Sequence, residues 1–487
     1  MQTVVERLIK STIEYENRYN KKLRKEHGQF FTPINIAQYM SEIFNIDGLN
    51  DELKILDPSG GTGILSVVLL LHILKNSNIQ KVIIDIYEND DNILPILYEN
   101  IEIIKNEYHK EKRNINVNIY NKNFITFDKN NNYDFIIGNP PYKKINKNTE
   151  EALTVGDLLY GQPNIYMIFM VHSLKLLNKN GQMVFIVPRS FFNGKYFHKF
   201  RKWLYKKFSI TYIHSFESRS KVFEDRILQE FIIIKIENKT TDTLLINYSN
   251  DERDIDKNKV FKISNNIVWD EDLRIRLPLN NLDVELLRLF DKSTLKIKDL
   301  SLVFKTGPIV DFRIKQGLYK KKTKDSVPLI WCANFDLYKI KWPIKNTKYE
   351  QYISYNFNKN SLLPMDNYIF VKRFASKEEK KILKINILTK NDLPYNYIGI
   401  ENHVNYLKFS DKISKLMKGV FILLNSNFYN RYFKIINGTT QINTSDLNDL
   451  PILSYELLEK LSIIDINYEN LTSDKCDDLI KLYINIY

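Results

Sequence analysis

The stretch LKILDPSGGTG, at residues 53–63, has the pattern of a buried strand that runs into a glycine-rich turn and a helix. Gly60, Gly61 and Gly63 carry no Cβ atom, so the turn can be tight and its backbone can approach a ligand closely. The helix N-terminus behind the turn would favour a carboxylate or another anion. The stretch is not a phosphate loop, because no Gly-Lys-Ser/Thr follows, and it is not a dinucleotide GxGxxG motif. Taken alone, such a turn can equally be a plain tight turn, so the surrounding pattern has to decide.

Strands and helices alternate around this turn through about the first 240 residues. Helices are expected at 1–27, 36–44 and 164–177, and after the strands that begin near residues 53 and 81. Further strands are expected at the start of 81–94 and at 115–120, 133–137, 181–188, 209–216 and 229–237. This alternation predicts an α/β fold with a doubly wound, mainly parallel sheet.

The chain changes character after this region. Residues 238–259 are polar and rich in Asn, Asp and Lys, as expected of a domain junction. Beyond about residue 290 the pattern is of short strands and turns with many aromatic residues, followed by amphipathic helices from Glu456 and near 476–487. With 487 residues the chain is too long for one ordinary domain. We therefore predict a catalytic domain at 1–240, a junction at 241–289 and a C-terminal α+β domain at 290–487.

The composition narrows the class of protein. A net charge of +13 suits a polyanionic partner, although the abundance of Asn, Ile and Lys makes this supporting evidence only. The two cysteines, Cys332 and Cys476, are far apart and form no CxxC pair, which predicts a reducing compartment and neither a zinc site nor a disulfide. The N-terminus lacks the apolar core of a signal peptide, and the longest apolar run, 64–74, is too short to span a bilayer. We therefore expect a soluble, cytoplasmic protein without a membrane partner.

Two further signals lie at the ends of the second and third expected strands. Glu88 is at the tip of the second strand, where doubly wound folds place a carboxylate for ribose hydroxyls. The alternative is a solvated acidic loop, since Asp90 and Asp91 follow. Asn123 and Phe124 should emerge beside the same crevice, where an amide could bond an adenine edge and an aromatic ring could pack on its face. Phe124 alone would more often be core, but the order of glycine turn, helix, strand and acidic tip is seldom due to chance.

The stretch DFIIGNPPYKK, at 134–144, ends the fourth expected strand on two prolines. The prolines fix two φ angles and remove two backbone donors, and they favour an extended Asn139. An ordinary rigid loop is the alternative. At the carboxyl edge of the sheet, however, the side-chain carbonyl of Asn139 and the backbone carbonyl of Pro140 could accept both hydrogens of an exocyclic amino group. Such a pair would aim the nitrogen lone pair at an electrophilic methyl group, and the ring of Tyr142 could stack on a planar base.

DPSGGTG followed by NPPY resembles the motif pair of S-adenosylmethionine-dependent N6-adenine DNA methyltransferases. GQFFTP at 28–33, together with the long domain after NPPY, resembles their gamma class, found in type II restriction–modification systems. The resemblance covers residues 28 to about 237. It implies a class I methyltransferase sheet of the Rossmann-like type, S-adenosylmethionine as cofactor and double-stranded DNA as partner.

The resemblance also implies roles for individual residues. Asn123 stands where the family usually has Asp, which keeps an acceptor but loses a charge. An aromatic residue is expected on the far face of a flipped adenine; Phe223 is favoured over Phe216, and packing is the alternative for both. The catalytic residues implied are Asn139, Pro140, Tyr142 and Phe223. The cofactor-binding residues implied are Thr32, Pro33, Asp57, Pro58, Ser59, Gly60, Gly63, Glu88, Asn123, Phe124 and Pro141.

The C-terminal region carries stretches in which Lys and Arg interleave with Phe and Tyr, at 303–315, 319–325, 368–381 and 431–443. Cationic side chains bind phosphates, and aromatic and amide groups can contact bases or wedge a duplex. For any single stretch, solvated lysines around an ordinary core explain the pattern as well. VKRFASKEE, IENHVNYL and NGTTQINTSDLNDLPI resemble the target-recognition domain of type II adenine methylases.

The function predicted is a site-specific adenine-N6 DNA methyltransferase, the modification component of a restriction–modification system. The alternatives are a protein-glutamine N5-methyltransferase and a DNA-binding specificity protein with an inactive methylase domain. The first usually has its extra domain before the glycine turn, and N4-cytosine methylases typically begin the tetrad with Ser. Too few residues precede GQFFTP for a fused nuclease domain, so a separate cognate restriction endonuclease stays open. One target adenine per chain needs no dimer, and a monomer is expected.

Overall fold

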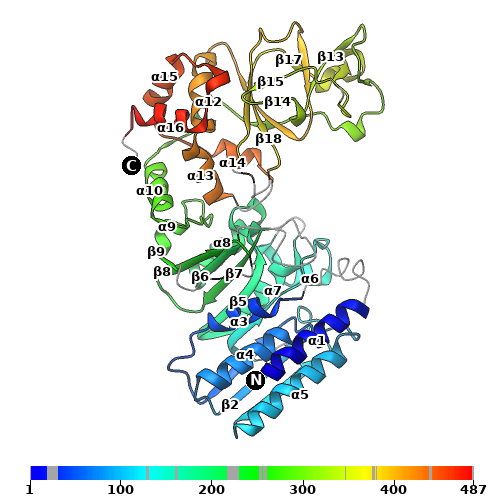
Figure 1. Ribbon diagram of the computed structural model, residues 1–487, viewed down its shortest axis with the longest axis vertical. Coiled ribbons are helices and arrows are strands. Elements are labelled where there is room, and N and C mark those ends of the chain that lie inside the picture. Colours follow the sequence, from blue (N-terminus) through cyan, green and yellow to red (C-terminus); the bar gives the residue numbers. More distant parts are fainter. Residues whose placement is uncertain are drawn as a thin grey trace. The chain divides into compact units, whose positions relative to one another are not determined.

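The computed structural model describes residues 2–18, 31–127, 131–159, 163–216, 230–251, 255, 260–345, 347–375, 379, 381–437 and 441–484. These residues fall into two compact units, Met1–Leu279 and Asn280–Tyr487 (Figure 1). Within these ranges, no helix combines the length and apolar character that a bilayer span requires.

The first unit is built on a nine-stranded sheet in the order β3-β2-β1-β4-β5-β7-β6-β8-β9. The pairings from β3 through β5 are parallel, and β7 runs antiparallel between β5 and β6. The chain moves outward from β1 to one side and from β4 to the other, so the order reverses between these two strands. In doubly wound sheets, ligands bind at the carboxyl ends of the strands at such a reversal. The strands are β1 (Glu52–Asp57), β2 (Lys81–Tyr87), β3 (Asn114–Tyr120), β4 (Tyr133–Gly138), β5 (Leu177–Pro188), β6 (Ser209–Phe216), β7 (Phe231–Glu237), β8 (Thr243–Ser249) and β9 (Phe261–Ser264).

Helices flank the sheet because its central strands are apolar on both faces. β7 is buried at every position, as expected of a strand covered on both sides. α1, α3, α4 and α5 pack on one another, and α7 packs on β5. The helices are α1 (Gln2–Arg18), α3 (Ile34–Glu42), α4 (Ile64–Asn76), α5 (Leu94–Lys110), α6 (Glu150–Leu153), α7 (Ile165–Lys175), α8 (His198–Lys207) and α9 (Asn265–Val268). The predicted doubly wound, mainly parallel α/β fold is confirmed.

The first unit extends further than the predicted domain at 1–240. The predicted junction at 241–289 contains β8 and β9, which add two strands to the sheet, and the division between the units falls after Leu279. Among the described residues of the polar stretch, 238–242 connect β7 to β8 and 243–249 form β8 itself. Composition alone therefore made a segment that contains a strand of the sheet resemble a linker.

The second unit combines a six-stranded sheet, β11-β21-β18-β19-β15-β14, with a five-stranded sheet, β12-β16-β13-β20-β17, and a two-stranded sheet, β10-β22. The predicted C-terminal α+β fold is confirmed, but of its helices only α15 and α16 were predicted, whereas α10 to α14 were not. Its strands are β10 (Leu295–Lys296), β11 (Lys305–Thr306), β12 (Leu318–Tyr319), β13 (Ser326–Ile330), β14 (Phe335–Asp336), β15 (Lys339–Ile340), β16 (Tyr352–Ser354), β17 (Leu363–Pro364), β18 (Asn367–Lys372), β19 (Ile385–Leu388), β20 (Tyr397–Ile400), β21 (Val404–Phe409) and β22 (Pro451–Ile452). Its helices are α10 (Asn281–Asp291), α11 (Tyr355–Asn358), α12 (Met417–Asn425), α13 (Asn427–Ile436), α14 (Thr444–Asn448), α15 (Tyr455–Ile463) and α16 (Ser473–Lys481).

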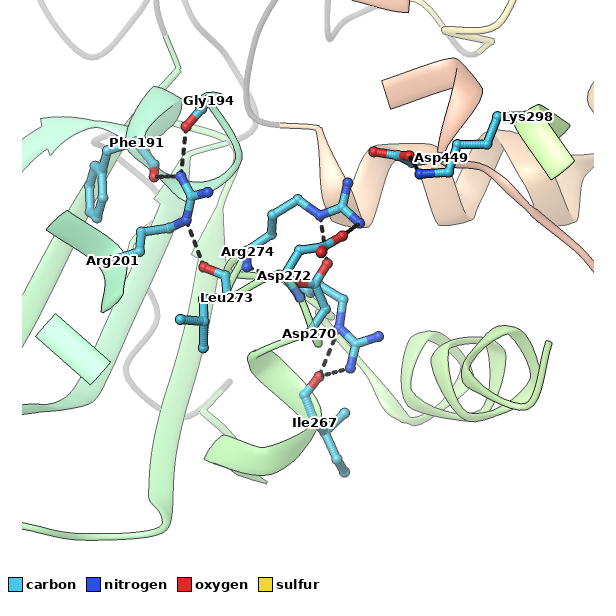
Figure 2. Close-up of polar contacts among 11 residues, drawn as sticks. Phe191, Gly194, Arg201, Ile267, Asp270, Asp272, Leu273, Arg274, Lys298 and Asp449 are labelled. Carbon is cyan, nitrogen blue, oxygen red and sulfur yellow. Dashed lines mark hydrogen bonds and ion pairs between the residues drawn. The ribbon is translucent and has the colours of Figure 1, made fainter. Parts of the chain in front are cut away.

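A buried arginine ties the end of the first unit to its sheet. Arg201 on α8 is 2% exposed and donates hydrogen bonds to the backbone carbonyls of Phe191 (3.0 Å), Gly194 (2.8 Å) and Leu273 (2.6 Å) (Figure 2). Leu273 lies beyond β9, in the segment predicted as a junction. One guanidinium group therefore fixes that segment to the turn after β5, which explains why the first unit continues to Leu279.

We expect Arg201→Ala to destabilise the first unit, because it removes the side-chain donor from three carbonyls, of which that of Gly194 also accepts the backbone N–H of Phe197. Each buried polar group that loses its partner costs about 1–3 kcal/mol, which corresponds to a fall in Tm of about 5 °C or more. Thermal unfolding of the full chain measures this change. Lys202→Ala, which removes the same charge from an exposed position on the same helix, is the control and should leave Tm unchanged. Equal effects of the two substitutions would contradict the structural role of Arg201.

Candidate active site

A cavity of about 450 Å³ lies in the first unit, at the carboxyl ends of β1, β2, β3 and β4. Its walls come from the glycine turn, from the strand ends and from α6 and α7. This is the reversal point of the sheet, where a ligand was predicted. The predicted site residues that line it are Thr32, Pro58, Ser59, Gly60, Glu88, Asn123, Phe124, Asn139 and Pro141. Pro33, Asp57, Gly63, Pro140 and Tyr142 are not among its lining residues.

The glycine turn is held tightly against the end of β2. The backbone N–H of Gly60 donates to the carbonyl of Tyr87 at 2.8 Å, and a Cβ at Gly60 would come within 2.4 Å of Ile86. Gly63 has a φ of +85°, which side chains other than glycine rarely adopt, so it can end the turn and begin α4. The sequence therefore uses glycine where the backbone of the turn meets the sheet and where it enters the helix.

Asp57 lies beneath the turn and holds it in place. Its carboxylate is fully buried and accepts hydrogen bonds from the Oγ of Ser66 (2.7 Å) and the backbone N–H of Ser59 (3.1 Å). Burial raises the pKa of Asp57 from its ordinary value of 3.8 to about 7, although both hydrogen bonds act in the opposite direction. In this structure Asp57 positions the turn rather than facing the cavity.

Glu88 joins the glycine turn to the tip of β2. One carboxylate oxygen accepts from the backbone N–H of Gly61 (2.8 Å), and the other accepts from those of Asn89 and Asp90 (2.9 Å each). Burial raises the pKa of Glu88, and the three backbone donors limit the rise. A carboxylate oxygen can accept more than one hydrogen bond, so Glu88 can also receive hydroxyl groups from a ligand in the cavity.

The third strand contributes the predicted amide and aromatic pair. The Oδ1 of Asn123 accepts from the backbone N–H of Ile125 at 3.0 Å, and its Nδ2 donates to the Oε1 of Glu151 at 3.1 Å. Phe124 is 2% exposed and stacks on Phe169 with ring centroids 5.4 Å apart. Both phenylalanines line the cavity and give it a flat apolar wall. Glu151 was not predicted as a site residue.

The NPPY turn follows directly after β4. The Nδ2 of Asn139 donates to the Oγ1 of Thr32 at 3.0 Å, which joins this turn to the segment before the glycine turn. The hydroxyl group of Tyr142 contacts the Oδ1 of Asn139 and lies 2.8 Å from the backbone carbonyl of Ile186. Burial raises the pKa of Tyr142 well above its ordinary value, so the hydroxyl stays protonated and acts as a donor. Because it carries one proton and reaches two acceptors, it can bond Ile186 and leave Oδ1 to another donor.

The N-terminal segment covers the glycine turn. The hydroxyl groups of Thr12 on α1 and Thr62 in the turn lie 3.1 Å apart, and the rings of Tyr15 and Phe31 meet edge to face at 5.4 Å. Phe31 and Thr32 both line the cavity. Phe31 belongs to the GQFFTP stretch that carries the family resemblance. The motif therefore indicated that this segment lies at the cavity, although Phe31 itself was not among the predicted cofactor-binding residues.

The two candidates for the aromatic residue beside a flipped base are Phe216 and Phe223, and the structure describes only the first. Phe216 is 1% exposed, and its ring lies 4.6 Å from that of His214 within the hydrophobic core. It is therefore a packing residue. Phe223 lies outside the described residues.

The sheet order, the antiparallel β7, the glycine turn and the acidic tip of β2 together define a class I methyltransferase of the Rossmann-like type. Residues 63–223 match the Eco57I restriction-modification methylase family. The chain is 31% identical over 477 residues to the type II methyltransferase M.BsuBI of Bacillus subtilis, covering 94% of each chain. It is 28% identical over 480 residues to M.PstI of Providencia stuartii, covering 94% of this chain and 93% of the relative. The chain belongs to the type II DNA methyltransferases of restriction–modification systems, and its cofactor is S-adenosylmethionine.

The likeness to solved structures extends through both units. The cryo-electron microscopy structure of a DrdV–DNA complex covers 97% of this chain with a TM-score of 0.51 and 14% sequence identity, and the match spans 59% of the DrdV chain. At this level of identity, the similarity concerns the fold.

The residues around the cavity fit S-adenosylmethionine. The Oγ of Ser59, in the glycine turn, is buried and has no hydrogen-bond partner among the described residues, so it can serve a ligand. Glu88 offers acceptors for hydroxyl groups, and Phe124 and Phe169 offer a flat apolar surface for a ring. A volume of about 450 Å³ lies within the range of cavities that bind small cofactors.

The raised pKa of Asp57 predicts a pH dependence of the cofactor-free protein. The unfolded carboxyl group ionises near pH 3.8 and the folded one near pH 7, so the stabilising effect of its proton is complete below the first value and is lost as the pH rises through the second. Asp57→Asn removes this titration. Since about two pH units separate pH 5 from the folded pKa, we expect the substitution to raise the stability, relative to the wild type, by about 2–3 kcal/mol more at pH 8 than at pH 5.

Chemical unfolding without cofactor, at both pH values, measures the difference. Asp51→Asn, at an exposed position just before β1, is the matched control and should show no such change. If wild type and Asp57→Asn respond to pH in parallel, Asp57 is ionised in the fold throughout this range.

Proposed function

We propose that this chain transfers the methyl group of S-adenosylmethionine to the N6 atom of an adenine in double-stranded DNA, at a specific sequence. The observation that carries the proposal is the NPPY turn at the end of β4, where Asn139 lines the cavity beside the glycine turn. An asparagine in this place offers a side-chain carbonyl, and Pro140 offers a backbone carbonyl, at fixed positions. The chain would act as a monomer and as the modification partner of a separate restriction endonuclease.

In the proposed reaction, Asn139 and Pro140 act through position and electrostatics. The bound cofactor supplies an electrophilic methyl group. The Oδ1 of Asn139 and the carbonyl oxygen of Pro140 accept the two hydrogens of the amino group, so its lone pair is directed outward for the attack. The same two oxygens stabilise the positive charge that develops on the nitrogen, and one of the two hydrogens leaves as a proton after transfer.

Other residues prepare the site for this step. Thr32 holds the amide nitrogen of Asn139 and so directs Oδ1 rather than Nδ2 to the substrate. Tyr142 contacts Oδ1 and can release it by bonding Ile186. An adenine reaches such a site only when it leaves the base stack, and Tyr142 and Phe223 are proposed to stack on its two faces.

The second unit is proposed to recognise the target sequence. Three of the predicted stretches, those that contain Arg373, His403 and Ile442, meet at one end of its six-stranded sheet. The backbone N–H of Arg373 donates to the carbonyl of His403 (2.9 Å), and the backbone N–H of Ile442 donates to the carbonyl of Arg373 (2.7 Å). A cavity of about 280 Å³ at this end is lined by residues that include Trp331, Lys372, Phe374, Glu401 and His403.

A fourth stretch, at 303–315, reaches the same end of the sheet, because Ile309 forms a bridge with Glu401. Phe312 follows Ile309 closely and is 78% exposed, and the guanidinium group of Arg313 lies over its ring at 5.6 Å. A second such pair, Arg373 over Phe374 at 5.5 Å, lies at the same end. Exposed cationic and aromatic side chains suit phosphates and base edges.

Asn139→Ala should abolish methyl transfer and leave cofactor binding largely unchanged, because the substitution removes one amino-group acceptor and spares the glycine turn and Glu88. Purified protein is incubated with genomic DNA and methyl-labelled S-adenosylmethionine, followed by nucleoside analysis and single-molecule sequencing. The wild type should place the label in N6-methyladenine at one recurring sequence. Calorimetric titration with S-adenosylhomocysteine reports cofactor binding by both proteins.

Three outcomes would contradict the proposal or a part of it. Label in N4-methylcytosine, or in no nucleoside while the cofactor still binds, would contradict adenine methylation; the second result would favour a protein-glutamine substrate or an inactive specificity protein. Turnover retained by Asn139→Ala would remove the role assigned to its amide.

Arg313→Ala should weaken binding to duplexes that contain the target sequence about tenfold and reduce the preference for them over unrelated DNA. The reason is that one good base contact contributes about 1–3 kcal/mol of discrimination. Fluorescence anisotropy with duplexes containing and lacking the recurring sequence measures both quantities. Lys412→Ala removes the same charge from another exposed position of the second unit and should leave the preference unchanged. If Arg313→Ala binds both duplexes as the wild type does, this end of the sheet does not read the target.

A further inference from the structure

Asn123 departs from the family pattern at a position where a carboxylate would bind the adenine of the cofactor. In the structure its one acceptor atom is already engaged by the backbone. The Oδ1 of Asn123 bonds the backbone N–H of Ile125 at 3.0 Å and so closes a local turn after β3. Its Nδ2 is a donor, and a donor cannot receive an amino group.

That donor is directed to a carboxylate in the wall of the same cavity. The Nδ2 of Asn123 lies 3.1 Å from the Oε1 of Glu151, and both residues, together with Phe124, line the cavity. Glu151 lies 28 residues further along the chain, on the short helix α6 after the NPPY turn. The cavity therefore has a negative charge beside the end of β3, although the position after β3 is neutral.

The backbone beneath Glu151 is well fixed. The side chain of Thr149 caps α6 by accepting the backbone N–H of Ala152, and the hydroxyl of Thr154 donates to the carbonyl of Glu151 at 2.7 Å. Ala152 and Val155 are buried, and α6 packs against α7. The carboxylate of Glu151 thus starts from a rigid helical turn and is oriented at its far end by Asn123.

We propose that Glu151 is a cofactor-binding residue that accepts the exocyclic amino group of the adenine of S-adenosylmethionine, and that Asn123 positions it. The inference rests on the proposed use of this cavity for the cofactor. A carboxylate is a stronger acceptor of an amino group than an amide, and one hydrogen bond from Asn123 leaves its remaining lone pairs for the ligand.

The same geometry explains why position 123 carries an amide. An aspartate there would set two carboxylates about 3 Å apart, and the repulsion would favour protonation of one of them. Asn123 and Glu151 therefore form a matched pair, in which the charge has moved from the strand end to the helix.

The test compares two ligands that differ at the group in question, S-adenosylhomocysteine and its deaminated analogue S-inosylhomocysteine, which has a carbonyl in place of the amino group. The wild type should prefer the adenosyl compound, because the carbonyl of the analogue would face a carboxylate. Glu151→Ala should bind the adenosyl compound about tenfold or more weakly and lose most of the preference. Isothermal titration calorimetry gives both dissociation constants.

Glu150→Ala is the control, because Glu150 is the exposed neighbour on the same helical turn and does not line the cavity. It should retain the wild-type preference, and equal Tm values for the two variants confirm that the fold is preserved. If Glu151→Ala weakens the binding of both ligands equally, or of neither, Glu151 does not recognise the amino group and the inference fails. If the wild type binds neither ligand, the proposed use of the cavity fails instead.

Exchange of the pair provides an independent test. Asn123→Asp alone should lower the affinity for S-adenosylhomocysteine, since it brings two carboxylates together. Adding Glu151→Gln should restore much of the affinity, because the charge then stands at position 123 and an amide at position 151. A double variant that binds no better than Asn123→Asp would contradict the matched pair.

Discussion

The hydrogen bonds between the glycine turn and the tip of β2 are the constraint on which the site depends. Glu88 binds three backbone N–H groups at once, and Gly60 approaches β2 so closely that no side chain fits. Together, Glu88 and Gly60 fix the loop after β1 to the loop after β2. The cavity lies beside these loops, where the strand order reverses between β1 and β4. A buried Asp57 below the turn completes the arrangement, at a cost in desolvation that its hydrogen bonds offset only in part.

The NPPY turn is connected to the glycine turn through one side-chain contact as well as through the sheet. Asn139 is bound to Thr32, and Thr32 belongs to the segment that α1 and Phe31 place over the glycine turn. The orientation of the Asn139 amide, which we propose binds the amino group, therefore depends on the same segment that lines the cavity.

Much of the first unit was predictable because its signals are local. The strand that ends in DPSGGTG, the acidic tip and the NPPY turn each combine a hydrophobic run with residues of restricted conformation, and the family resemblance connected them. The limits of the unit were not predictable in this way, because β8 and β9 follow a polar stretch that resembles a linker, and because Arg201 reaches across 72 residues to Leu273. In the second unit, strands of two to six residues gave little periodicity, and α13 was obscured by a stretch that was interpreted for its charge and aromatic content.

Glu151 could not be identified from sequence for a related reason. No motif surrounds it, and its distance along the chain from Asn123 carries no pattern. The only local signal was the amide at position 123, which indicated a missing charge without showing where the charge had gone. In the proposed arrangement the adenine amino group requires an acceptor at a point in space rather than at a position in the chain, so different elements of the fold can supply it. Where a residue differs from a motif, the side chain that it contacts, here the carboxylate of Glu151, is therefore part of the interpretation.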